Sequence, residues 1–253
     1  MFNQTESAFG TIVLAPRKHG KSPVRESIYT DGTYLDRTGG TWHLEDSPFK
    51  ARQIARMLSR HPGFQPKTIC EIGCGAGGIL SELQQVLSKD VLFTGYEISP
   101  QANAMSARFS NPQCHFVLGD AFSDPQVFDL ALVMDVVEHV EDCFDFMRKT
   151  KRKAGMKLYH IPLDVHASGV LRGRNAWNSS GHLHLFTIET SLQSVEYTGH
   201  RLVDWMLTDG ALGSPNKAIR ARLANLARLP IAKASPKLAA RLLGGYSILI
   251  LAE

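Results

Sequence analysis

Residues 67–78 constrain the fold of this chain more than any other segment. An apolar run at 67–72 carries an acid, Glu71, and then breaks into a loop with four glycines in six residues, at 73, 75, 77 and 78. Glycine lets ligand groups come close to the backbone, and the helix expected at 77–88 offers unpaired N–H donors and the positive end of its dipole. This strand, loop and helix together predict a nucleotide-binding site.

The rest of the chain predicts an alternation of strands and helices. We expect strands at 67–72, 91–97, 113–118, 128–134, 156–161, 201–208 and 245–251. We expect helices at 47–60, 77–88, 100–109, 140–152 and 187–199. Such alternation is typical of a parallel sheet with crossover helices, and ligands of such sheets bind at the carboxyl ends of the strands.

The glycine loop by itself fits two kinds of cofactor. Gly73-x-Gly75-x-x-Gly78, with Glu97 downstream, also matches the dinucleotide fingerprint. Glu71 argues against a dinucleotide, because a carboxylate beside the loop would repel a pyrophosphate. The same carboxylate suits a ligand that carries an ammonium group and a sulfonium.

The segment Glu71-x-Gly73-x-Gly75-x-Gly77 resembles motif I of the class I S-adenosylmethionine (SAM) dependent methyltransferases. The resemblance extends over about residues 45–208 and the last strand, and it is strongest to a bacterial branch that acts on small molecules. It implies an α/β fold, a Rossmann-like doubly wound sandwich whose seven-stranded sheet is mostly parallel with an antiparallel last strand. We therefore expect a leader or lid at 1–46, a methyltransferase domain at 47–253, and a basic helical insertion at 210–244.

The same resemblance implies which residues bind SAM. Glu97, at the end of the second strand, would accept hydrogen bonds from both ribose hydroxyls, a task that suits a carboxylate. Asp120 would take the adenine amino group, and residues around Met134 would run beside the methionine part. The full set of expected cofactor residues is Glu71, Gly73, Cys74, Gly75, Gly77, Glu97, Ile98, Asp120, Ala121, Met134 and Asp135.

Glu138 and His139 are the candidate catalytic residues, because they follow the fourth strand, near the expected position of the methyl group. The imidazole of His139 titrates near neutral pH and could remove a proton from a hydroxyl acceptor. Asp135-x-x-Glu138-His139 also resembles a motif of methyltransferases that use a divalent metal, and 181–186, with His182 and His184, could add a ligand. A structural role for Glu138 and His139 is the third interpretation, and the sequence alone assigns no metal ligand.

The insertion at 210–244 contains seven cations and no acid. It is either a helical cap over the acceptor side or a basic surface that rests on an anionic membrane. It has few aromatic residues, which makes nucleic acid an unlikely partner. The oligomeric state cannot be predicted.

The most favoured function is SAM-dependent methyl transfer to oxygen of a small metabolite, a sugar or a lipid-linked intermediate. The alternatives are a metal-assisted RNA methyltransferase and a catalytically silent binding module. The four cysteines form no CxxC pair, and no segment has the length of a signal peptide or membrane span. We therefore expect a cytoplasmic protein with reduced, buried thiols.

Overall fold

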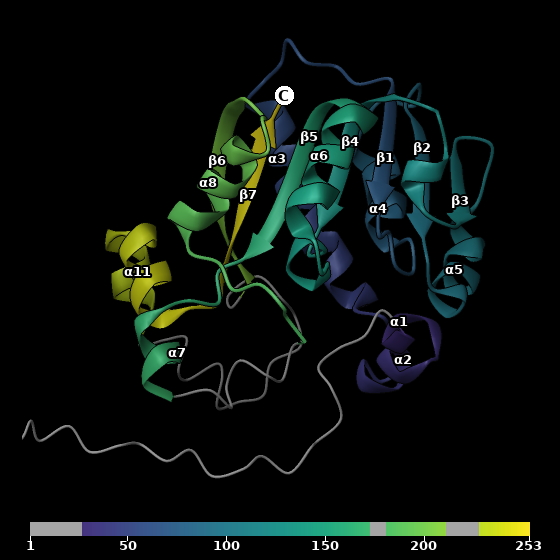
Figure 1. Ribbon diagram of the computed structural model, residues 1–253. Coiled ribbons are helices and arrows are strands. Elements are labelled where there is room, and N and C mark those ends of the chain that lie inside the picture. Colours follow the sequence, from purple (N-terminus) through teal and green to yellow (C-terminus); the bar gives the residue numbers. More distant parts are fainter. Residues whose placement is uncertain (1–26, 173–180, 211–227) are drawn as a thin grey trace, which may run out of the picture.

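The computed structural model describes residues 27–172, 181–210 and 228–253 (Figure 1). The first 26 residues of the expected leader and residues 211–227 of the basic insertion lie outside the described residues. Within the described part, residues 228–234 and α11 (Pro236–Leu243) are helical. None of the helices described is long and apolar enough to cross a bilayer.

One sheet of seven strands, in the order β3-β2-β1-β4-β5-β7-β6, forms the centre of the described chain. β7 is antiparallel to both of its neighbours, and the other strand pairs are parallel. The predicted fold class is therefore confirmed. The strands are β1 (Thr68–Ile72), β2 (Leu92–Glu97), β3 (Cys114–Leu118), β4 (Phe128–Met134), β5 (Ala154–Pro162), β6 (Leu202–Asp209) and β7 (Tyr246–Ala252).

Helices cover both faces of the sheet (Figure 1). On one face, α3 (Ser47–Ser59) and α4 (Gly78–Val86) contribute Ile54 and Leu80 to a buried apolar cluster. On the other face, α6 (Cys143–Lys153) and α8 (Ile188–Tyr197) contribute Met147 and Val195 to a second cluster. Burial on both faces explains why β4 reads as a nearly continuous apolar run rather than an alternating one.

The expected elements agree with the observed ones within three residues at each end. The largest differences are of three residues, at the end of α5 (Pro100–Ser106), which we expected at 109, and at the start of α6, which we expected at 140. The segment before it forms a short 3-10 helix, η4 (Val137–His139), and α6 begins only after Asp142, whose side chain accepts a hydrogen bond from the Asp145 N–H at 2.9 Å. An N-cap aspartate fixes the start of a helix in this way.

The remaining helices are short. Figure 1 places α1 and α2 beyond the carboxyl ends of the strands, and α7 beside α11. Their bounds, with those of α5 and the other 3-10 helices, are α1 (Ser27–Thr30), α2 (Thr33–Arg37), η1 (Leu44–Asp46), α5 (Pro100–Ser106), η2 (Ala107–Phe109), η3 (Ala121–Ser123) and α7 (Ala167–Arg172).

Candidate active site

The glycine loop between β1 and α4 forms the floor of the site. Its Gly73 and Cys74 N–H groups donate to the carbonyl oxygen of Tyr96 on β2, at 2.9 and 3.0 Å. Gly75 has a φ of 53°, and a Cβ there would lie 2.8 Å from the indole ring of Trp42. Both the backbone conformation and the contact with Trp42 therefore require glycine at this position.

Glu97 connects this loop to the end of β2. Its side chain is buried, with one carboxylate oxygen accepting from the Gly75 N–H at 2.7 Å and the other from the Ser99 N–H at 2.8 Å. Burial raises the pKa of Glu97, and these backbone N–H groups oppose the rise. Each oxygen keeps a further lone pair with which it can accept a ligand hydroxyl. The role in holding the loop was not predicted.

Glu71, on β1, is a buried acid with an unpaired oxygen. It is 1% exposed, and its Oε2 has no hydrogen-bond partner among the described residues. Burial raises the pKa of Glu71 to about 8, Lys50 opposes this effect, and Glu97 adds to it. Because an unpaired buried carboxylate is costly, a ligand with a cationic group would be favoured beside it.

Two adjoining cavities bring the predicted cofactor residues together. One, of about 500 Å³, is lined by Glu71, Met134 and the glycine loop, and the other, of about 870 Å³, by Glu97 and Asp120. Gly77 lines neither cavity: it caps α4, and a Cβ there would clash with Phe116. The predicted residues that do line a cavity are Glu71, Gly73, Cys74, Gly75, Glu97, Ile98, Asp120, Ala121, Met134, Asp135, Glu138 and His139.

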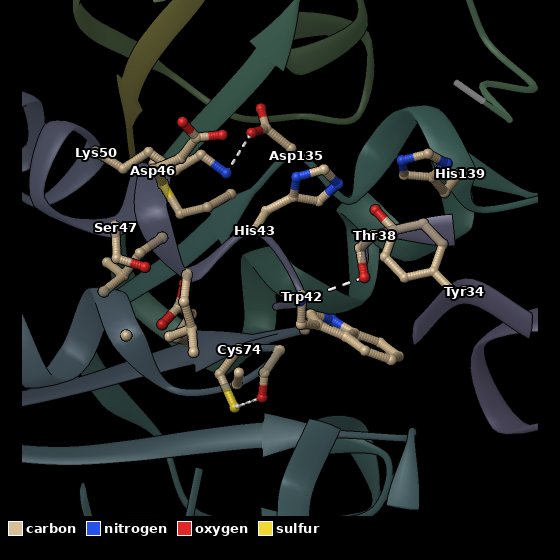
Figure 2. A pocket seen from close by; sticks show the side chains of 18 of the residues that line it. Tyr34, Thr38, Trp42, His43, Asp46, Ser47, Lys50, Cys74, Asp135 and His139 are labelled. Atoms are coloured by element: carbon tan, nitrogen blue, oxygen red, sulfur yellow. Dashed lines mark hydrogen bonds and ion pairs between the residues drawn. The ribbon is translucent and has the colours of Figure 1, made fainter. Parts of the chain in front are cut away.

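Aromatic side chains from the segment before α3 line the same cavities. The rings of Tyr29 and Tyr34 are 4.9 Å apart, and those of Tyr34 and Trp42 are 5.0 Å apart. Figure 2 shows Tyr34 and Trp42 next to each other, with His139 beyond Tyr34. Trp42 and His43 both have a left-handed backbone, at φ 51° and 57°, a conformation that non-glycine residues seldom adopt.

Asp135 is held by two basic side chains. Lys50 Nζ lies 2.7 Å from one of its carboxylate oxygens, and His160 Nδ1 lies 2.5 Å from the other (Figure 2 shows the lysine contact). Burial acts to raise the pKa of Asp135, but His160 and Lys50 hold it far below its usual range. His160 is fixed in turn by Thr208, 2.9 Å from its Nε2. No pattern in the sequence indicates that Lys50 would reach Asp135.

Glu138, His139 and His182, which we name the acid–histidine cluster, each offer a ligand atom within 4.8 Å of the others. Burial raises the pKa of Glu138 well above its usual range, and Asp135 adds to this effect. Burial, followed by the neighbouring His182, lowers the pKa of His139 to about 4, so its imidazole is neutral at pH 7. His182 Nδ1 lies 2.5 Å from a carboxylate oxygen of Asp164. The sequence motif suggested Asp135 as a member of this cluster. In the structure, His182 takes that place.

A sheet with this strand order, a glycine loop after β1, and acids after β2 and β3 defines the class I SAM-dependent methyltransferase fold. Comparison with known families agrees with this assignment. The family model described as "Methyltransferase domain" matches residues 43–203, which is more than half of the chain. The chain therefore belongs to the methyltransferase-domain family, whose cofactor is SAM.

The chain is also similar in sequence to curated methyltransferases. The chain is 29% identical over 137 residues to norajmaline N-methyltransferase of Rauvolfia serpentina, covering 52% of this chain and 47% of the relative. It is 35% identical over 125 residues to the mitochondrial ubiquinone biosynthesis O-methyltransferase of Schizosaccharomyces pombe, covering 46% and 44%. The matched region thus spans a little under half the length of these curated relatives.

The fold is similar to that of magnesium protoporphyrin IX methyltransferase from Synechocystis PCC 6803, solved with bound S-adenosylhomocysteine (SAH). The TM-score is 0.60 at 14% identity, covering 90% of this chain and 99% of that protein.

Proposed function

We propose that this protein transfers the methyl group of SAM to an oxygen atom of a small molecule, such as a metabolite, a sugar or a lipid-linked intermediate. The observation that carries the proposal is the acid–histidine cluster in the wall of the cofactor cavity, next to Met134 and Asp135. A hydroxyl acceptor needs its proton removed or its oxygen polarised, and buried carboxylate and imidazole groups are suited to that task.

The cavity residues fit SAM in three places. The unpaired oxygen of Glu71 would accept from the ammonium group, the free lone pairs of Glu97 from the ribose hydroxyls, and Asp120 from the adenine amino group. SAM supplies a methyl group on a positively charged sulfur, which is a good leaving group. The protein then has mainly to align the acceptor with the methyl carbon.

In the reaction, the acceptor oxygen forms a bond to the methyl carbon as the carbon–sulfur bond breaks, and SAH is released. The proton of the acceptor passes to the acid–histidine cluster. The Asp164 contact orients His182, so that Nε2 of this ring is the nitrogen left to accept a proton. Glu138 and His139, the two residues predicted to be catalytic, belong to this cluster.

The named relatives support a small-molecule acceptor and leave the acceptor atom open, because one is an O-methyltransferase and the other an N-methyltransferase. A neutral amine is already nucleophilic and needs little proton removal. Oxygen is favoured here because a buried acid and two half-buried imidazole groups would have little to do beside a neutral amine.

The RNA alternative is disfavoured by the contacts of three of the four described basic residues of the insertion, since only Lys233 is exposed without such a contact in that part of the chain. Arg228 donates to the carbonyl oxygen of Gly244 at 2.7 Å, the Lys237 ammonium lies 4.8 Å from the centre of the Trp205 ring, and Arg241 pairs with Glu189. These cations contact their own chain, which favours the helical cap over a polyanion surface. Contact of the basic insertion with an anionic membrane remains part of the proposal for a lipid-linked acceptor.

The aromatic residues at 29–42 would act as a lid on the 47–253 domain, because Tyr29, Tyr34 and Trp42 line its cavities. All four cysteines are free and buried, which is compatible with a reducing cytoplasm.

The test is transfer of labelled methyl from SAM into an extract of the source cells, separated into small-molecule, lipid and macromolecular fractions. We expect label in the small-molecule or lipid fraction, attached to oxygen, and suppressed by excess SAH. Label in RNA would overturn the proposal in favour of the RNA alternative. Label on nitrogen would correct the acceptor atom. Binding of SAH without any transfer would support a silent module.

A further inference from the structure

The hydroxyl group of Tyr29, on α1, is a buried donor that has no hydrogen-bond partner among the described residues. The Tyr29 ring lines the larger of the two cavities, which Glu97 and His139 also line. A buried hydroxyl without a partner costs stability unless a ligand, an ion or water binds to it. The Tyr29 hydroxyl is therefore available to a molecule that enters this cavity.

The surroundings of Tyr29 keep its hydroxyl protonated. Burial, followed by the neighbouring Tyr34 and Glu138, raises the pKa of Tyr29. Glu97 adds to this rise, and Arg37 opposes it. At neutral pH the group is thus a hydrogen-bond donor, within electrostatic reach of both the expected ribose acid and the acid–histidine cluster.

Tyr29 is also part of a row of five aromatic rings along the cavity walls. The ring centroids are 5.0 Å apart for Trp42 and Tyr34, and 4.9 Å apart for Tyr34 and Tyr29. The row continues to His139, 5.9 Å from Tyr29, and to His182, 4.8 Å from His139. Each ring lines at least one cavity, and Figure 2 shows Trp42, Tyr34 and His139 of the row. The row leads from the glycine loop, against which Trp42 packs, to the acid–histidine cluster.

A flat aromatic molecule gains more from such a row than a saturated molecule of the same size. Aromatic rings attract one another in edge-to-face and offset arrangements, in addition to the gain from burying apolar area. The larger cavity is also lined by Val136, Val140 and Leu183. These side chains pack well against a flat apolar surface, but they offer no hydrogen bonds to the many hydroxyl groups of a sugar.

The basicity of the proposed proton acceptors favours an acidic hydroxyl. Burial, followed by His182, lowers the pKa of His139 to about 4, which makes this imidazole a weak base. A phenol has a pKa of about 10 and gives up its proton much more readily than the alcohol group of a sugar does. A phenol is therefore the kind of hydroxyl acceptor that suits this cluster.

We propose that the acceptor is an aromatic hydroxyl compound, a phenol, whose ring packs against Tyr29 and Tyr34 and whose reacting oxygen accepts a hydrogen bond from the Tyr29 hydroxyl. This inference rests on the proposed function, because it names the acceptor of the same methyl transfer to oxygen. The phenol oxygen bonds to the methyl carbon as the carbon–sulfur bond breaks, and the phenol proton passes to the acid–histidine cluster. Tyr29 keeps its own proton and stabilises the negative charge that develops on the reacting oxygen.

The test measures binding to the full-length protein saturated with SAH, so that no methyl transfer can occur. The probes are 2-naphthol, naphthalene, which lacks the hydroxyl group, and decahydro-2-naphthol, which has the same skeleton without aromatic rings. We expect calorimetry to show 2-naphthol bound at one site per chain, at least about 10-fold more tightly than decahydro-2-naphthol.

Three variants separate the hydroxyl from the ring. Tyr29→Phe should weaken 2-naphthol binding about 3- to 10-fold and leave naphthalene binding unchanged, because naphthalene has no oxygen to accept the hydrogen bond. Tyr34→Leu should remove the preference for 2-naphthol over decahydro-2-naphthol. Tyr197→Phe, at an exposed tyrosine of α8, is the matched control, and it should bind all three probes like the unchanged protein.

SAH binding, measured on every variant, shows whether the fold and the cofactor site are intact. If Tyr34→Leu fails to bind SAH, the comparison of probes and Tyr29→Phe carry the test. The proposal is overturned if 2-naphthol does not bind the SAH complex, or if it binds no more tightly than decahydro-2-naphthol. It is also overturned if Tyr29→Phe weakens SAH binding instead of 2-naphthol binding, which would place Tyr29 in the cofactor site.

The binding test does not depend on methyl transfer, so the two proposals can fail separately. Absence of label transfer to oxygen, with the expected binding of 2-naphthol, would overturn the proposed function alone. Label transfer to oxygen of a non-aromatic compound, without a preference for 2-naphthol, would overturn the phenol acceptor alone.

Discussion

Two groups of buried and half-buried polar side chains lie in different parts of this protein, and they differ in whether their polar atoms have hydrogen-bond partners inside it. The acid–histidine cluster lies beyond β4, and Glu138 in it has no hydrogen-bond partner among the described residues. The second group, which we name the His200 cluster, consists of Tyr159 on β5 and of Thr198 and His200 in the turn between α8 and β6. There, His200 Nε2 pairs with the Tyr159 hydroxyl at 2.9 Å and Nδ1 with Thr198 at 3.0 Å.

The pKa values do not distinguish these two clusters. Burial lowers the pKa of both His139 and His200 to about 4. What differs is whether the polar atoms have partners inside the protein. A buried polar group with partners stabilises the fold, whereas one without a partner costs stability unless a ligand, an ion or water binds to it. We therefore propose a functional role for the acid–histidine cluster and a structural role for the His200 cluster.

The largest expected effect is on catalysis. His182→Gln removes an imidazole of the acid–histidine cluster and should lower the rate of methyl transfer by about 10²- to 10⁴-fold, the usual contribution of an acid–base group. The measurement is the rate of label transfer from SAM at saturating SAM. His184→Gln, in the same loop, should keep its rate, and an equal loss in both variants would show that the loop rather than the imidazole matters.

The next effect concerns pH and the His200 cluster. The pKa of His200 is lowered, first by burial and then by Lys157, from about 6.5 in the unfolded chain to about 4 in the folded protein. As the pH falls from about 6.5 to about 4, His200 binds a proton in the unfolded chain before it does so in the folded protein. The free energy of unfolding therefore falls by about 3 kcal/mol. Urea unfolding at several pH values measures this loss of free energy of unfolding. His200→Gln should be less sensitive over this window, and an unchanged pH profile would contradict the assignment.

A smaller effect is expected at the cofactor subsite. Glu71→Gln replaces the unpaired carboxylate by a neutral amide of the same shape and should weaken SAM binding about 10- to 100-fold, because a charged hydrogen bond is lost. Titration calorimetry measures the affinity. Glu189→Gln, an exposed acid on α8, is the control. Equal affinities for SAM in Glu71→Gln and Glu189→Gln would show that Glu71 does not contribute to cofactor binding.

The smallest effect tests the structural cluster directly. Tyr159→Phe removes the hydroxyl that pairs with His200 Nε2 and should cost about 1 kcal/mol of stability. For a protein of this size, that lowers the melting temperature by about 2–4 °C. Label transfer by the folded variant should stay at the normal rate, and a large loss of rate without a change in melting temperature would break the distinction between the two clusters.

The sequence predicted the fold well because local signals agreed with one another. Each local pattern indicated its own local structure, and contacts with other parts of the sheet did not change it. Examples are the apolar run of β4, the glycine loop and the acid Glu97 at the end of β2. The beginning of α6 was misplaced because the N-cap Asp142, rather than the apolar pattern, fixes where the helix starts.

The acid–histidine cluster was predictable only in part. Glu138 and His139 follow a strand, so their position near the cavity could be expected. Whether Asp135, His182 or His184 would join them depends on the backbone of Asp135, on a contact from α3 and on how one loop is hydrogen-bonded. Such long-range contacts leave no periodic signal in the sequence.

The most direct test of this account is Glu138→Gln, with label transfer and melting temperature measured on the same preparation. The substitution removes a buried acid that has no hydrogen-bond partner among the residues the structure describes. We predict a rate lower by at least about 100-fold and a melting temperature that is unchanged or higher. A normal rate with a lower melting temperature would show that Glu138 stabilises the fold, and would contradict the account.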